Sequence, residues 1–397
     1  MEYVVVFLTV ALLVFYTIER FVVQTRVGAI PLRIAVTGTR GKSSVTRLIA
    51  AGLSAGGYRV VAKTTGSRAV TILPSGAEVP IRRSGLPNIL EQKTILNFAR
   101  RQRSDAVVIE VMSIKPENYN VELKKLIQPH LVVITNVRLD HVEALGESIE
   151  QAGTVFALGV PSQCRLVVFL KDDCPKILWK TLEKRALCIH PVSKDTYKSL
   201  LAEYSRKDYY EWEGNLSLAL AVCEAVGIPS GRALKAMLRA KPDFGALKIW
   251  RVIVLNKQWF AVNAFAANDL VSTQQVYDRI VAWNRDQRLP MVGILNLRGD
   301  RADRTLQWLQ ALRAKALRFG RLFISGAGAS VVARKLRPHL HCECPIEALH
   351  VRSADPEKIM QTIAAVEPQG GIVFGFGNIG GLGAALVEYW EKSGELV

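Results

Sequence analysis

The segment Gly38–Ser44, with the sequence G-T-R-G-K-S-S, holds the residue types that bind nucleotide phosphates. Glycine lets the backbone approach an oxyanion closely, and Lys42 adds a positive charge beside it. The common phosphate-loop pattern G-x-x-x-x-G-K-[ST] would need a glycine at position 36, where this chain has Val36. The sequence therefore predicts a phosphate-binding loop of shorter spacing.

Each residue of this loop has an expected role in binding ATP. Lys42 would reach the β- and γ-phosphates, and the hydroxyl of Ser43 or Ser44 would bind Mg²⁺. The alternative, a glycine-rich turn with an exposed lysine, is disfavoured because G-K-S-S stands between a strand pattern and a helix pattern. The predicted nucleotide-binding residues are Gly38, Thr39, Arg40, Gly41, Lys42, Ser43 and Ser44.

Polar side chains stand at the ends of two apolar runs. Glu110 ends the run AVVIE, where a carboxylate is costly unless it is paired or binds a cation. Asn136, Asp140 and His141 follow the run LVVIT. In a parallel sheet the ligand lies beyond the carboxyl ends of the strands, so these groups are expected to meet there. We predict a divalent metal site formed by Ser43, Glu110 and His141.

The elements that would position these residues can be predicted from hydrophobic periodicity. Short apolar runs alternate with helical patterns after residue 30, which is typical of a parallel sheet covered by helices. Strands are expected at 33–37, 59–62, 106–111, 131–135 and 166–170, and helices at 43–55, 89–101, 116–127, 215–226 and 230–239.

A second unit begins after a break at residues 241–245. A predicted hairpin at 249–255 and 259–262 is followed by strands at 291–295, 321–324 and 372–374, with helices between them. We therefore predict an α/β fold, with a P-loop parallel-sheet ATPase domain at 30–243 and a smaller Rossmann-like α/β domain at 244–397.

The N-terminus is predicted to be a membrane helix. Residues Tyr3 to Ile18 carry no charge and would span about 24 Å as a helix, and Phe21 to Val23 extend the run toward a hydrocarbon core of about 30 Å. No basic region precedes the run and no cleavage site of small residues follows it, which disfavours a signal peptide. Arg20, Arg26 and Arg33 follow, so residues 1–24 are expected to be a single-pass anchor in the cell membrane, with the catalytic domains in the cytoplasm. A buried or interfacial helix is the alternative.

The charge composition limits the kinds of partner that the chain is expected to bind. The 397 residues include 52 Lys and Arg against 35 Asp and Glu, a net charge of +17 that predicts an acidic partner. A nucleic-acid-binding module is disfavoured because the chain has no basic run, aromatic platform motif or helix-turn-helix pattern. The six cysteines form no C-x-x-C pair, and the cluster at 339–344 matches no zinc motif, so a reducing compartment and a structural role for this cluster are expected.

Several motifs together resemble the ATP-dependent amide ligases of the Mur ligase family, which include the folylpolyglutamate synthases. The loop T-G-T-R-G-K-S-S, the strand-end Glu110, and T-N-V-R-L-D-H ending in His141 resemble that family's nucleotide and metal segments. Segments 169–173, 214–228 and 297–305 resemble further motifs of the family. The resemblance implies that Asn215 lies near the adenine and that Arg301 reaches the phosphates when the two domains close.

The chain differs from the family's sequence pattern at two places. The chain has N-A-F-A-A-N-D at 263–269 where relatives have D-x-A-H-x-P. It also has no lysine between Gly146 and Leu170, where many relatives carry a carbamylated lysine that orders a second metal, and Phe156 is near that position. The number of Mg²⁺ ions therefore stays open. With its predicted anchor, the chain most resembles the membrane-anchored ligase subunits of bacterial poly-γ-glutamate synthases, which make capsules.

This resemblance implies a ligase that uses ATP and Mg²⁺ to activate a terminal glutamate carboxylate as an acyl phosphate and joins it to the amine of another glutamate, releasing ADP. The implied catalytic residues are Lys42, Glu110, His141 and Arg301. Additional nucleotide contacts are implied for Asn136, Asn215 and Asn263. Candidates for contact with the acceptor chain are Thr64, Thr65, Arg82 and Arg83.

The implied partners are glutamate, the growing poly-γ-glutamate chain, the cell membrane and other membrane subunits of a capsule or polyglutamate synthase. No nucleic acid is expected, and a homo-oligomer stays open. The alternative function is a membrane-tethered P-loop kinase or NTPase. It is disfavoured because such a protein would be expected to have the full loop pattern and a strand-end aspartate, where this chain has Val36 and Glu110.

Overall fold

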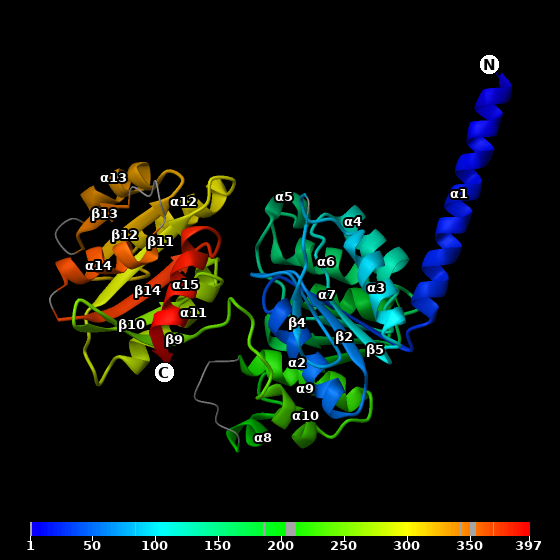
Figure 1. Ribbon diagram of the computed structural model, residues 1–397, viewed down its shortest axis with the longest axis horizontal. Coiled ribbons are helices and arrows are strands. Elements are labelled where there is room, and N and C mark those ends of the chain that lie inside the picture. The colour runs from blue at the N-terminus through cyan, green and yellow to red at the C-terminus, as the bar shows by residue number, and fades with distance from the viewer. Residues whose placement is uncertain are drawn as a thin grey trace. The chain divides into compact units, whose positions relative to one another are not determined.

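The computed structural model describes residues 2–83, 85–185, 187–203, 212–340, 344–349, 355–367 and 369–397. The chain divides into two compact units, one holding the described residues up to 203 together with Trp212–Asp243, and the other Phe244–Val397 (Figure 1). Both units are mixed α/β with largely parallel sheets, so the predicted fold class is confirmed. His341, Cys342 and Glu343 of the predicted structural cluster lie outside the described residues.

The first unit is built, within the described residues, on an eight-stranded sheet of order β4-β3-β2-β5-β1-β6-β7-β8. Six strands are parallel, while β3 and β4 add an antiparallel hairpin at one edge. Both faces of the parallel strands are covered, which explains why the sequence shows continuous apolar runs there. The strands are β1 Leu32–Thr37, β2 Val60–Thr64, β3 Val70–Ile72, β4 Glu78–Pro80, β5 Ala106–Glu110, β6 Leu131–Ile134, β7 Leu166–Leu170 and β8 Ile189–Val192.

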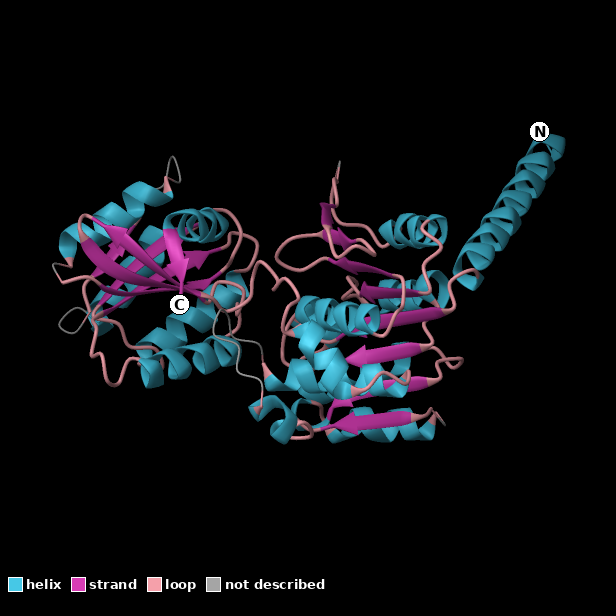
Figure 2. Cartoon of the chain, turned by 60° about the horizontal axis from the view of Figure 1, so that its bottom comes forward, coloured by secondary structure: helices cyan, strands magenta, loops and turns pink. Residues whose placement is uncertain are grey.

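Helices lie on both faces of this sheet (Figure 2). On one face α2, α9 and α10 bury residues such as Leu48 and Leu220. On the other, α3, α4, η1, α6 and α7 bury residues such as Leu96 and Phe156. The helices are α1 Glu2–Gly28, α2 Lys42–Ala55, α3 Glu91–Arg101, α4 Pro116–Val121, the π-helix η1 Glu122–Ile127, α5 Val142–Leu145, α6 Ile149–Gly159, the 3₁₀-helix η2 Lys171–Asp173, α7 Lys176–Lys184, α8 Lys198–Ala202, α9 Glu213–Ala225 and α10 Ser230–Met237.

The register of the central strands brings the predicted site residues together. Strand β1 lies between β5 and β6, with Val36 paired to Glu110 and Thr37 paired to Ile134. The segments that follow these three strands therefore leave the sheet at the same edge. This edge, at the carboxyl ends of parallel strands, is where ligands bind in such sheets.

The second unit is a seven-stranded sheet, among the described residues, of order β13-β12-β11-β14-β10-β9-β15. Strands β9 and β15 are antiparallel to their neighbours and the others are parallel. Its core includes Trp259, Phe265, Phe323 and Trp390. The elements are β9 Ile249–Val254, β10 Lys257–Asn263, α11 Leu270–Trp283, β11 Met291–Leu297, α12 Ala302–Arg313, β12 Arg321–Gly326, α13 Ala329–Leu340, β13 Ile346–Ala348, α14 Pro356–Val366, β14 Gly371–Gly377, α15 Leu382–Ser393 and β15 Gly394–Leu396.

Helix α1 is, in the described part of the chain, the one helix long and apolar enough to cross a membrane. Within its span Glu2–Thr25, an 18-residue window has a mean hydropathy of 2.0 and contains no buried residue. Its last turn is docked on the first unit, because Val27 is only 2% exposed and the Arg33 guanidinium donates hydrogen bonds to the carbonyls of Val27 (3.0 Å) and Ile30 (2.8 Å). Lys93 of α3 also pairs with Glu19.

The predicted strands of both units are present, with ends shifted by at most three residues. The helix predicted at 116–127 is wrong in part, because it is α-helical only to Val121 and continues as the π-helix η1. Strands β3, β4, β8, β13 and β15 were not predicted. They have three or four residues each, too few to produce a period, and β8 contains Pro191.

Candidate active site

The glycine loop follows β1 and ends at the first residue of α2, Lys42. Gly38 and Gly41 have positive φ angles of 118° and 78°. A Cβ atom at Gly38 would lie 2.3 Å from Thr135 Oγ1, and one at Gly41 would lie 2.7 Å from Asn215 Oδ1. Both positions therefore require glycine. The first backbone N–H groups of α2 have no hydrogen-bond acceptor within the helix, so they can bind an oxyanion.

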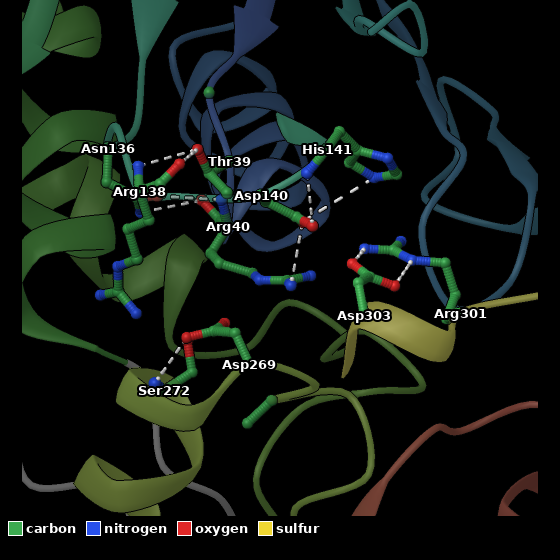
Figure 3. A network of polar contacts seen from close by, with 12 residues as sticks. Thr39, Arg40, Asn136, Arg138, Asp140, His141, Asp269, Ser272, Arg301 and Asp303 are labelled. Atoms are coloured by element: carbon green, nitrogen blue, oxygen red, sulfur yellow. Dashed lines mark hydrogen bonds and ion pairs between the residues drawn. The ribbon is translucent and has the colours of Figure 1, made fainter. Parts of the chain in front are cut away.

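The segment after β6 holds this loop in shape (Figure 3). The side-chain oxygen of Asn136 accepts a hydrogen bond from Arg40 N at 2.9 Å, and its amide donates to Arg40 O at 3.0 Å. Arg138 N donates to Thr39 Oγ1 at 3.0 Å. Asn136 and Thr39 thus fix the backbone of the loop in this structure. Arg138, which we did not predict, could have been noted from its place inside the T-N-V-R-L-D-H segment.

Lys42 lies folded over the loop that precedes it. Its ammonium donates to Gly38 O at 2.8 Å. Burial lowers the pKa of Lys42, and the nearby carboxylates of Glu110 and Asp140 partly oppose that shift. The position combines a half-buried cation with the start of a helix, which is the electrostatic arrangement that receives phosphate oxygens.

Glu110, at the end of β5, lies at the base of the loop and is only 2% exposed. Its Oε2 accepts hydrogen bonds from Ser43 Oγ at 2.8 Å and from Thr65 N at 2.6 Å. Burial raises the pKa of Glu110, while the charge of Lys42 and these two hydrogen bonds act against that rise. A carboxylate beside a hydroxyl is a donor pair for a hard divalent cation, whose charge would stabilise the ionised form.

The absence of a side chain at Gly66 leaves space beside Ser43 and Glu110. A Cβ atom there would lie 2.3 Å from Ser43 Oγ and 3.7 Å from Glu110 Oε1. Ser43 and Glu110 therefore fit the Mg²⁺ ion that the family resemblance implies. No group of three or more His, Cys, Asp or Glu side chains suited to a metal exists among the described residues, so the remaining ligands would be water and phosphate oxygens.

His141 follows β6 and contacts Asp140. It adopts a left-handed conformation with φ of 51°, and its Nε2 is 3.8 Å from Asp140 Oδ2, which also pairs with Arg40 at 3.1 Å (Figure 3). Of the three predicted metal ligands, Ser43 and Glu110 are in direct contact, and the role of His141 as a ligand stays a prediction.

The candidate acceptor residues have different surroundings. Arg82 is exposed, whereas Arg83 forms a bidentate pair with Glu91 through distances of 2.7 and 3.0 Å. The ammonium of the fully buried Lys63 lies 3.0 Å from the same carboxylate. Burial alone would raise the pKa of Glu91, but the hydrogen bonds from Arg83 and Lys63 outweigh it and lower that pKa to about 2. A lysine inside the apolar strand R-V-V-A-K-T was the signal that the sequence offered for this network.

Thr64 and Thr65 follow Lys63 along the chain. Thr64 is fully buried, and Thr65 contributes its backbone N–H to Glu110. Phe156, near the position where many relatives carry lysine, packs edge to face on Tyr119 with ring centroids 5.8 Å apart. The core therefore fills the space around this position with aromatic rings.

Two predicted residues belong to the second unit. Asn263 is 1% exposed and donates to the carbonyls of Phe244 and Ala246, both at 3.2 Å, while its side-chain oxygen has no hydrogen-bond partner among the described residues. Arg301 pairs with Asp303 at 3.2 Å (Figure 3) and lines a small pocket with Arg298 and Asn378.

Sequence comparison identifies both units. The Mur ligase middle domain matches residues 36–224, and the poly-gamma-glutamate synthase CapB C-terminal domain matches residues 251–393. The chain is 35% identical to the capsule biosynthesis protein CapB of Bacillus anthracis over 311 residues, which are 78% of this chain and 66% of that protein. It is 31% identical to PGA synthase CapB of Bacillus subtilis (strain 168) over 369 residues, which are 92% of this chain and 91% of that protein.

Solved structures share the fold. E. coli FolC in complex with ADP has a TM-score of 0.64 at 17% identity, with 94% of this chain and 93% of that chain covered. The Yersinia pestis bifunctional folylpolyglutamate synthase/dihydrofolate synthase complexed with AMPPNP and Mn ion has a TM-score of 0.64 at 16% identity, with coverage of 94% and 92%. The predicted family resemblance is confirmed. The chain belongs to the CapB family and carries a Mur ligase middle domain.

Proposed function

We propose that the chain is an ATP-dependent, ADP-forming amide ligase that builds poly-γ-glutamate. The terminal carboxylate of the acceptor would take the γ-phosphoryl group, and the amine of an incoming glutamate would then displace phosphate and form the amide bond. The assignment of the substrate draws on the two CapB relatives, and the likeness to FolC supports the fold of a carboxylate-activating ligase.

The observation that carries the proposal is the buried Glu110, which is hydrogen-bonded to Ser43 and interacts electrostatically with Lys42. The backbone of the loop and the Lys42 ammonium would neutralise the charge that develops when a carboxylate approaches a phosphate. Glu110 and Ser43 would hold Mg²⁺, which supplies further positive charge at the phosphate oxygens. Burial excludes water and so strengthens each of these interactions.

The other candidate residues complete the proposal. We propose that Asn136 supports nucleotide binding by shaping the loop, that Asn215 contacts the nucleotide beside Gly41, and that the exposed Arg82 guides the anionic acceptor. His141 is proposed to act through Asp140 on the phosphate side of the site.

Three further contacts are proposed from the same resemblance. Arg301 and Asn263 of the second unit are proposed to meet the phosphates and the amine side during turnover. Thr64 and Thr65 are proposed to contact the acceptor, and the hydrogen bond from Thr65 N to Glu110 supports this proposal.

We further propose that α1 anchors the chain in the cell membrane with both units in the cytoplasm. The hydropathy of α1 and its unburied surface support this location. The other subunits of a capsule synthase would be its partners there, and polymer made beside them could be passed outward.

The function is tested with the full chain purified in detergent. We expect phosphate release from ATP that depends on added glutamate, and a product series in which successive species differ by one glutamate in mass spectrometry. Phosphate release that is indifferent to glutamate, with no amide product, would instead establish the generic P-loop NTPase.

Lys42→Ala is the matched test of the phosphate site. Turnover should fall by about 10³-fold or more, because the loop loses the ammonium that stands at the start of α2. Lys180→Ala, which removes an exposed lysine of α7 in the same unit, should leave turnover unchanged. Substantial activity in the Lys42→Ala variant would contradict the assignment of the site.

A further inference from the structure

Helix α10 is packed tightly against α2. A Cβ atom on Gly52 of α2 would lie 2.8 Å from Met237 Cε and 3.5 Å from Ala233 Cβ, so the two helices meet closely there. Ala233, Leu234 and Met237 are fully buried. The inner face of α10 is therefore fixed by the core, and its outer face has a defined position.

That outer face carries three exposed cations. Arg232 and Lys235 lie on α10, and Arg239 follows two residues after its end. A spacing of three and then four residues places them on one side of the helix, about 4.5 and 6 Å apart along its axis. None of the three forms an ion pair within the described residues.

The three cations surround a hollow of about 550 Å³, whose other lining residues are Ala55, Ala236 and Ala240. No carboxylate lines the hollow, and the alanine methyl groups are too small to fill it. Ala55 is the last residue of the 14-residue α2, so the hollow lies about 20 Å along that helix from Lys42 at its start.

This arrangement matches the chemistry of a γ-linked polycarboxylate. Each γ-linked residue leaves its α-carboxylate free, and consecutive residues of an extended chain are about 6 Å apart. A row of cations with similar spacing can therefore contact successive carboxylates. A single exposed ion pair contributes little, but several contacts on one chain add together.

We propose that this hollow binds the growing poly-γ-glutamate chain through its α-carboxylates and retains the product between successive additions. The proposal rests on the proposed function, because it takes the product of that reaction as its ligand. The polymer is much longer than the span of α2, so it can occupy the hollow while its end is at the phosphate loop. A glutamate dimer is too short to reach both places.

The test compares the full chain in detergent with the triple variant Arg232→Gln, Lys235→Gln and Arg239→Gln. The matched control removes the same charge from three exposed residues of the same unit, by Arg101→Gln, Lys125→Gln and Arg165→Gln. Binding is measured by fluorescence anisotropy with labelled purified poly-γ-glutamate. Catalysis is measured as amide formation on a glutamate dimer and as the length distribution of the polymer.

We expect the triple variant to raise the Kd for the polymer about tenfold, as the loss of three exposed charge contacts would, and to shorten the product. The rate on the dimer should stay unchanged, and the control should match the wild type in all three measurements.

Three results would overturn the proposal. The first is equal polymer binding and equal product length in the triple variant and the wild type. The second is an equal loss of binding and length in the control. The third is wild-type binding to vesicles of anionic phospholipid without binding to the polymer. Failure of amide formation on the dimer by the wild type would instead refute the proposed function, which the binding measurement alone does not test.

Discussion

The Ser43 hydroxyl donates a 2.8 Å hydrogen bond to the Glu110 carboxylate, joining the first turn of α2 to the end of β5. This contact links the residue after the phosphate-loop lysine to a carboxylate on the neighbouring strand. Because Glu110 is buried, the pair has little access to bulk water, and a cation arriving with the nucleotide would meet a prepared ligand set.

Glu110→Gln is expected to lower the ligase rate by about 10²-fold or more, because the amide keeps the shape but loses the charge that holds a cation. The tightening of AMPPNP binding by Mg²⁺, measured by titration calorimetry, should disappear. The thermal midpoint should not fall, since a buried charge has been removed. Glu117→Gln, at an exposed carboxylate of α4, is the control, and an unchanged Mg²⁺ effect in Glu110→Gln would refute the metal assignment.

Gly66→Ala tests the space beside that pair. The new methyl group would meet Ser43 Oγ at 2.3 Å and force it away from Glu110. We expect a loss of about 1–3 kcal/mol in the free energy of unfolding and at least a tenfold lower rate. Gly231→Ala, a helical glycine with open space around its Cβ position, should be neutral or slightly stabilising. Wild-type activity in Gly66→Ala would show that the gap is not needed.

The Glu91 carboxylate should make stability depend on acid pH. Its pKa is lowered from 4.5 to about 2 in the folded chain, so its contribution is complete above pH 4.5 and is lost as the pH falls toward 2. Glu91→Gln should remove about 1–3 kcal/mol at neutral pH, because Lys63 and Arg83 lose their shared partner.

Chemical denaturation at several pH values checks this expectation. The difference between wild type and Glu91→Gln should shrink from pH 4.5 downward, while Glu143→Gln, at an exposed carboxylate, should show no such difference. A difference between wild type and Glu91→Gln that does not change with pH would contradict the lowered pKa.

Removal of residues 2–24 should leave nucleotide binding intact. The fully buried residues of this segment begin at Val27 and Ile30, which the truncation retains, whereas the partly buried Val23 is removed. The lost pair between Glu19 and Lys93 is half exposed and contributes about 0–1 kcal/mol. The Kd for AMPPNP should change by less than about twofold. An unfolded product, seen by circular dichroism, would show that α1 belongs to the core.

The sequence predicted the parts of the fold whose physics is local. The parallel strands are continuous apolar runs because both faces are buried, and the glycine loop is visible because positive φ angles at Gly38 and Gly41 require that residue. Glu110 could also be predicted as a site residue, because an ionisable group at the end of an apolar run needs a partner.

Contacts between distant segments could not be predicted in this way. The pairing of Arg83 with Glu91 depends on the position of Arg83 relative to α3, which no hydrophobic period in the sequence indicates. Asn136 was expected to touch the nucleotide, but its bonds to Arg40 show a second role in shaping the loop. The place of His141 depends on its left-handed backbone conformation, which is rare outside glycine and is set by tertiary structure.

The hydrogen bonds from Arg33 to the end of α1 would affect how the first unit diffuses. Only residues 29–31 separate α1 from β1, the strand that leads into the phosphate loop, and Arg33 ties both sides of this short link together. With α1 in a lipid bilayer, diffusion of the first unit would be confined to two dimensions at a fixed height. Encounters with other membrane proteins would then be more frequent than in free solution, while a dissolved acceptor would gain no such advantage.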